Sequence, residues 1–181
     1  MIFDQKDKIV MKIISLNESN IWLGDRGIEI SNESLAAFGY DKVASYVIPI
    51  DSGKKTFISK VITSFFSEDA EALFLINEFG IWPTAENWGL FNGFRKSIGE
   101  ICPLPEKPGH IFSRQEIDTI FSLLSMTLYF YWGAIMFSPA KNLLIKVSHD
   151  EIIEVFTNKK IYVEKELNEL NEILKEHKRP N

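Results

Sequence analysis

Short runs of β-branched and aromatic residues alternate with stretches of helical spacing along most of the chain. Residues 72–79 form an apolar run too short for periodicity to separate strand from helix, and we favour a strand. The Gly24-Asp25-Arg26-Gly27 group predicts a hairpin or a tight meander between residues 21–23 and 28–30. The predicted strands cover residues 9–16, 21–23, 28–30, 43–48, 72–79, 143–147 and 152–156.

Capping residues mark where helices begin. Ser31 or Asn32 predicts a short helix ended by Gly39, and Asp51 or Ser52 predicts a longer one. The longer helix has apolar residues at helical spacing, namely Phe57, Ile58, Val61, Ile62 and Phe65. Thr84 precedes a third helix, which Gly99 ends. Gly89 and Gly93 within it predict close approach of another backbone or a bound group.

The most apolar part of the chain predicts one long helix from Ser113 to about Phe137. Ser113 and Glu116 form a capping box at its start. Residues 119–137 carry no formal charge and are long enough to span a membrane. Their aromatic block, residues 129–132, does not mark both ends of a span. We therefore favour a buried central helix over a membrane span.

The C-terminal part, residues 160–178, predicts an amphipathic helix. Val163, Leu167, Leu170 and Leu174 alternate in spacings of four and three. Two such repeats favour a surface helix docked on the core, and the alternative is a weak homodimer formed through this helix. The pattern as a whole predicts one α+β domain, residues 1–181. Its β-sheet packs against several helices, including the long buried apolar one.

Composition narrows the classes of partner. The 181 residues are 45% hydrophobic and 25% charged, which is ordinary for a globular domain. A formal charge of −5 argues against binding nucleic acid through its phosphates. Cys102 is the single cysteine, and the first sixteen residues lack the apolar core of a secretory signal. Both observations favour a cytoplasmic protein.

Familiar catalytic motifs are absent from the sequence. Asp51-Ser52-Gly53-Lys54-Lys55-Thr56 departs from the Walker pattern, so we expect an ordinary capped helix with lysines reaching solvent. Histidines 110, 149 and 177 lack zinc-protease spacing, Cys102 has no built-in base, and no Gly-x-Ser-x-Gly elbow occurs. We therefore predict no catalytic residue, metal site or cofactor.

Candidate binding residues gather in one unusual segment. Trp82, Glu86, Asn87 and Trp88 surround the predicted start of the third helix, and Arg95 follows two turns beyond Trp88. Such a group can bind a ligand or a partner protein, although aromatic residues at helical spacing are more often core. His110 and His149 complete the candidate set. His149 lies in Ser148-His149-Asp150-Glu151, which also has the spacing of a capping box.

Five ordered landmarks resemble those of an uncharacterised family of bacterial proteins, over residues 21–155. They are Gly24-Asp25-Arg26-Gly27, Tyr46-Val47-Ile48-Pro49, Gly80-Ile81-Trp82-Pro83 with Glu86-Asn87, Pro108-Gly109-His110 with Phe112, and Ser148-His149-Asp150-Glu151. The resemblance implies a bacterial source and carries no assigned activity. Where it leads one to expect an acidic residue after Tyr131-Trp132, this chain has Gly133.

Two functional hypotheses follow from these residues. The first is a non-enzymatic protein that binds and masks another protein, as an accessory or immunity-type protein does. The second is a small-molecule hydrolase or transferase that draws Glu86, Arg95, His110 and His149 into one cleft. The arrangement of those four side chains in space distinguishes the two.

Overall fold

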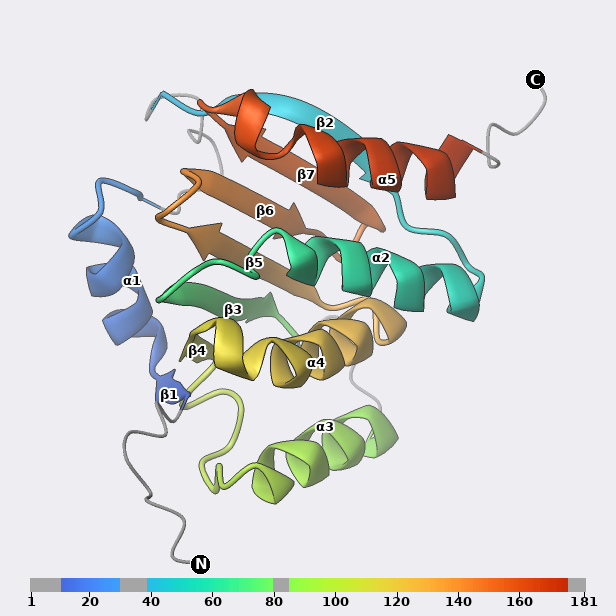
Figure 1. Cartoon of the computed structure of the whole chain (residues 1–181). Coiled ribbons are helices and arrows are strands. Elements are labelled where there is room, and N and C mark those ends of the chain that lie inside the picture. The colour runs from blue at the N-terminus through green and yellow to red at the C-terminus, as the bar shows by residue number, and fades with distance from the viewer. Residues whose placement is uncertain (1–10, 30–38, 80–84, 176–181) are drawn as a thin grey trace, which may run out of the picture.

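The computed structural model describes residues 11–29, 39–79 and 85–175, and it has the predicted α+β class (Figure 1). One antiparallel sheet of seven strands forms its centre, in the order β1-β4-β3-β5-β6-β7-β2. The strands are β1 (Lys12–Ile14), β2 (Asp41–Val47), β3 (Ala72–Glu78), β4 (Gly109–Phe112), β5 (Gly133–Ser138), β6 (Leu143–Val147) and β7 (Ile152–Thr157). The helix predicted after Ser31 lies outside the described residues.

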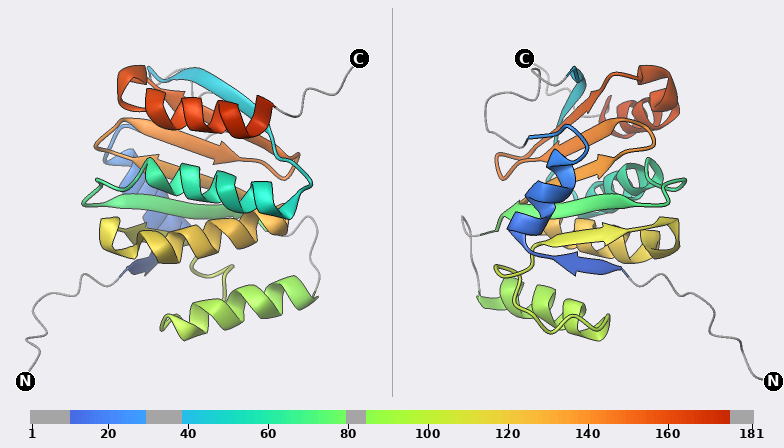
Figure 2. Two further views of the ribbon diagram at one scale, coloured as in Figure 1. Left: turned by 45° about the vertical axis from the view of Figure 1, so that its right-hand side comes forward. Right: turned by 90° about the vertical axis from the view of Figure 1, so that its left-hand side faces the viewer.

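Helices cover both faces of the sheet. α2, α4 and α5 lie side by side on one face, and α1 lies on the other (Figure 2). α3 lies at the end of the sheet formed by β1 and β4. Their bounds are α1 (Leu16–Gly24), α2 (Ser52–Ser64), α3 (Ala85–Ser97), α4 (Ile117–Tyr129) and α5 (Glu164–Lys175). Two short 3-10 turns, η2 (Arg114–Glu116) and η3 (Lys160–Tyr162), precede α4 and α5.

Strand β3 separates two hydrophobic cores. Successive side chains of a strand point to opposite faces, so Phe74 and Ile76 join the core beneath α2, α4 and α5. Leu73 and Leu75 join the core beneath α1. A strand that is apolar on both faces reads as a continuous hydrophobic run, and this explains the ambiguous pattern of residues 72–79.

The predicted hairpin around Gly24 is wrong, because the chain forms helix α1 there. Ser15 and Glu18 make a capping box: the Glu18 amide donates to Ser15 Oγ at 3.2 Å, and the Ser15 amide donates to Glu18 Oε2 at 2.8 Å. Trp22 and Leu23 are buried against the sheet. Arg26 stacks on the Trp22 ring at 3.7 Å and pairs with Glu71 at 2.9 Å. The Gly24-Asp25-Arg26-Gly27 group therefore follows the end of α1, and Arg26 connects this helix to Glu71 at the start of β3.

The long helix predicted from Ser113 to Phe137 is shorter. α4 ends at Tyr129, and the last part of the run is β5, buried throughout between β3 and β6. The reversal takes place at Tyr131, whose φ of 55° is left-handed. A buried helix followed by a buried central strand gives one continuous apolar run, and hydrophobic periodicity does not show where the helix ends and the strand begins. No helix in the described ranges combines the length and apolar character that crossing a bilayer requires.

Helices α2 and α5 form where their patterns predict them. The Asp51 carboxylate caps α2 by accepting from the Lys54 amide at 2.7 Å. α5 docks with Val163, Leu167 and Leu170 buried. Phe57 departs from its predicted place on the core face of α2, since 60% of its surface is exposed. The approach of another backbone predicted at Gly89 and Gly93 is also wrong, because a Cβ at either position meets no atom of another described segment within 4 Å.

Candidate functional site

The structure divides the predicted site residues among separate places. Trp82 lies outside the described residues. Trp88 is half-buried, with its ring 5.5 Å from that of Phe79 and 5.6 Å from that of Trp132. Glu86 is exposed in the first turn of α3, and Asn87 is half-buried beside it. Trp88 therefore forms an aromatic cluster with Phe79 and Trp132 near the N-terminal end of α3.

Arg95 and His110 come together in the interior beneath α3. They are 1% and 0% exposed. Arg95 Nη2 donates to the carbonyl of Lys107 at 2.7 Å, which ties α3 to the proline-rich connector before β4. Nε and Nη1 of Arg95 and both ring nitrogens of His110 have no hydrogen-bond partner. The pair therefore belongs to the core, where Arg95 orients the connector.

Burial controls the charge state of His110. Desolvation and, secondarily, the positive charge of Arg95 lower its pKa from 6.5 to about 3. The carbonyls of Phe74 and Pro108 lie near enough to oppose this shift slightly, although neither makes a hydrogen bond with good geometry. His110 is therefore neutral at physiological pH. A neutral imidazole can lie beside a buried guanidinium without charge repulsion.

His149 lies in a different region, where β3 and β6 end. Its Nδ1 is 2.8 Å from Glu78 Oε2, and its Nε2 is 3.3 Å from Asp150 Oδ1. The hydrogen bond to Glu78 is the main reason why its pKa is raised. Phe74, opposite His110, precedes Glu78 by four positions, or about 13 Å along a strand. Glu86, Arg95, His110 and His149 are therefore not assembled into one cleft.

Glu78 was absent from the residues proposed from sequence. It is 71 positions from His149, and no local pattern links the two. The sequence feature related to Glu78 is Gly133, which lies opposite Glu78 where the β3–β5 register shifts. A Cβ on Gly133 would overlap the Glu78 carboxylate and lie 2.6 Å from the Glu78 Cβ. The glycine therefore leaves the space through which Glu78 reaches His149.

Lys55 closes the same region from the side of α2. It is buried at 3% exposure, and its Nζ lies 3.7 Å from the centre of the Tyr131 ring. This cation–π contact corrects the expectation that the lysines of this helix reach solvent. Within the described ranges, no three His, Cys, Asp or Glu side chains are arranged to hold a metal ion. The described contacts are therefore internal ones: Glu78 and His149 hold the β6–β7 turn to β3, and Lys55 and Tyr131 hold α2 to the turn between α4 and β5.

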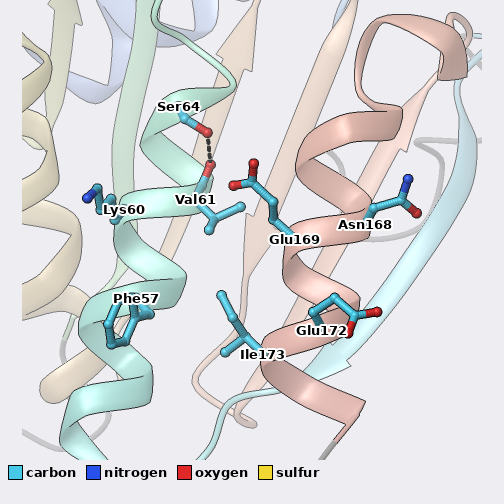
Figure 3. A pocket seen from close by; sticks show the side chains of 8 residues that line it. All are labelled: Phe57, Lys60, Val61, Ser64, Asn168, Glu169, Glu172 and Ile173. Carbon is cyan, nitrogen blue, oxygen red and sulfur yellow. Dashed lines mark hydrogen bonds between the residues drawn. The ribbon is translucent and has the colours of Figure 1, made fainter.

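Two open grooves formed by the described residues lie on the helical face. A groove of about 520 Å³ runs between α2 and α5 (Figure 3). Val61 and Ile173 project into it from the two helices, Phe57 lines it on the α2 side, and the Glu169 carboxylate extends from α5 toward α2. Ser64 turns back to its own helix and donates to the Val61 carbonyl at 2.7 Å. The groove thus presents apolar side chains and an acidic wall.

A second groove of about 470 Å³ lies on the other side of α2, against α4. Ile117 and Phe121 supply its apolar lining, and Asp118 supplies an acidic group. Lys60 and Ser64 line both grooves, because they occupy the ridge of α2 between them. Sequence periodicity identified these helices but could not show that they pack with open grooves at the surface.

Comparison with known proteins adds no further constraint. No protein-family model, curated protein or solved structure matches the chain. The functional argument therefore depends on the geometry described above.

Proposed function

We propose that this protein acts by binding another protein through the ridge of α2 and the two grooves beside it. The observation that carries the proposal is Phe57, an aromatic side chain left 60% exposed at an apolar groove. Burying such a side chain contributes about 1.5–3 kcal/mol. Aromatic residues at the rim of a pocket are typical anchors of protein interfaces.

The charges around the grooves indicate which groups a complementary partner surface should carry. Glu169 on α5 and Asp118 on α4 form outer walls, and Lys60 lies on the ridge between them. A complementary surface has two apolar side chains about 10 Å apart, the width of a helix. It also has a basic group opposite each outer wall and an acceptor opposite Lys60. This pattern fits a folded protein partner better than a small molecule, because the two grooves are shallow and adjacent.

This binding surface differs from the segment favoured by the sequence. Arg95 is buried and tied to the connector, so it is unavailable as an interface anchor. Phe57, Lys60 and Glu169 take its place in the proposal. The proposed role is that of a bacterial accessory or immunity-type protein that masks its partner.

Site-specific photocrosslinking tests the surface. A photoreactive phenylalanine at position 57 is compared with the same group at Ile21, which is 56% exposed on α1 and lies on the opposite face. In cells of the source organism, we expect one discrete crosslinked protein from position 57 and none from position 21. Equal crosslinking from the two positions, or none from position 57, contradicts the proposal.

Measuring the Kd and the thermal unfolding of surface variants then distinguishes a loss of binding contacts from a loss of folding. With the purified crosslinked protein, Phe57→Glu should raise the Kd at least tenfold, which is about 1.4 kcal/mol. Ile21→Glu should leave the Kd unchanged. The thermal unfolding of both variants should match that of the parent protein, because both side chains are largely exposed. An unchanged Kd for Phe57→Glu excludes this surface.

A further inference from the structure

β2 is the last strand of the sheet, and half of its backbone groups point away from the sheet. The Ile48 amide donates to the Glu151 carbonyl at 2.7 Å, so Ile48 faces β7. Backbone groups alternate in direction along an antiparallel strand. Tyr46 and Ala44 therefore also face β7, whereas Ser45 and Val47 face outward. No strand among the described residues pairs with this outer side.

This edge lacks most of the features that keep sheet edges from pairing. Natural edges carry charged side chains, prolines or bulges along their length. In β2 the charges of Asp41 and Lys42 and the bulge after Lys42 are confined to its first residues, and the proline, Pro49, comes only after the strand has ended. Residues 43–50 carry no charge, and Val47 and Ile50 are 70% and 79% exposed. The second half of β2 is thus open to strand pairing.

We propose that β2 pairs with β2 of a second copy of this chain, in antiparallel orientation about a two-fold axis at Tyr46. Ser45 of each copy then lies opposite Val47 of the other, so all four outward-facing residues form backbone hydrogen bonds. The two sheets become continuous. Such an isologous interface uses the same patch on both copies, as cyclic dimers do.

The charges along this edge permit a second copy. A groove of about 280 Å³ separates β2 from α5, and the α5 side presents one cation and one anion, Lys160 and Glu164. The neutral amides Asn168 and Asn171 follow along the helix. The two-fold axis makes the two α5 helices antiparallel, so Lys160 and Glu164 of one copy face the end of α5 that carries Asn168 and Asn171 in the other copy. Residues 43–49 of the two copies lie opposite one another in this register and carry no charge, so the paired segment itself brings no like charges together, although the whole chain carries −5.

Sedimentation equilibrium from micromolar to millimolar concentration tests the dimer. We expect a monomer–dimer equilibrium for the parent protein and for Ser45→Ala. Ser45→Pro should be monomeric, because it removes an outward-facing amide without removing a hydrogen bond to β7. A parent protein that stays monomeric throughout overturns the proposal and leaves β2 as an edge for a strand of another protein. A dimer in Ser45→Pro also overturns it.

Disulfide crosslinking tests the register even if Ser45→Pro fails to fold. In a Cys102→Ser background, Tyr46→Cys should form an intermolecular disulfide, because cross-strand Cβ atoms at a non-hydrogen-bonded pair are about 4.5–5.5 Å apart. Val47→Cys is the control: it is more exposed, but its copy lies about 9 Å away across the axis. Crosslinking of Val47→Cys in preference to Tyr46→Cys contradicts the pairing. Phe57→Glu should leave the dimer intact, which separates this inference from the proposed function.

Discussion

The interior beneath α3 and the strand-end region each contain a histidine, and the two regions treat the imidazole in opposite ways. His110 is fully buried beside Arg95, and its pKa falls to about 3. His149 is part-exposed between Glu78 and Asp150, and its pKa is raised. Desolvation and a neighbouring cation disfavour the charged form, whereas a carboxylate partner favours it. The comparison shows that a histidine chosen from sequence as a candidate base can be either neutral or charged, depending on distant residues.

The two histidines also link stability to pH in opposite directions. A lowered pKa means that the unfolded chain binds the proton first, so His110 reduces stability as the pH falls below 6.5. A raised pKa means that the folded protein binds the proton more tightly. The stabilisation by His149 is complete below pH 6.5 and is lost as the pH rises through its folded pKa. Together they favour stability near neutral pH.

The largest expected effect is the acid sensitivity from His110. Between pH 6.5 and pH 4.5 its protonation in the unfolded state should lower the free energy of unfolding by about 2 kcal/mol. Urea unfolding at the two pH values measures this loss. His110→Gln does not titrate in this range, so its loss should be smaller by about the same amount. Equal losses in both proteins would show that His110 is accessible to protons in the fold.

The next effect concerns the space that Gly133 leaves for Glu78. Gly133→Ala should lower the free energy of unfolding by about 1–3 kcal/mol, because its Cβ overlaps the Glu78 side chain. It should also return the pKa of His149 toward its ordinary value. Gly89→Ala is the matched control in open space on α3, and it should raise stability by about 0.5–1 kcal/mol. Gly133→Ala with parental stability would contradict the packing described at the β3–β5 pair.

The smallest effect isolates the partner of His149. Glu78→Gln should lower the pKa of His149, because the carboxylate hydrogen bond is the main cause of its raised value. Titration of the imidazole signals by NMR measures the shift directly. Glu71→Gln is the control, since Glu71 pairs with Arg26 near α1 and contacts no histidine. A His149 pKa that is the same in Glu78→Gln and the parent would assign the shift to Asp150 instead.

Local patterns predicted those parts of the fold whose signals lie within one element. The cap at Asp51, the strand runs of β6 and β7, and the leucine spacing of α5 are all of this kind. The prediction failed at α1 because the short run 21–23 has strand-like composition, although Ser15 and Glu18 cap a helix. It failed again at α4 and β5 because a buried helix and a buried strand have the same apolar composition.

The candidate sites were less predictable because they depend on contacts between distant segments. Arg95 reaches Lys107 and shifts the pKa of His110, and no spacing rule states either relation. Phe57 fits the apolar spacing of its helix and yet lies at a groove, because α5 leaves it uncovered. Helical periodicity identifies an apolar side chain, but the packing of neighbouring helices decides whether solvent reaches it.

The position of β2 in the sheet has a consequence for synthesis of the chain. β2 is an early strand, but its partner is β7, and the paired residues Lys42 and Glu154 are 112 positions apart. At typical translation rates of 5–20 residues per second, β7 emerges roughly 6–20 s after β2. During that interval the uncharged segment 43–50 has no native partner on either side. The nascent protein therefore exposes an uncharged strand during this interval, and we expect chaperones to bind unfinished chains there.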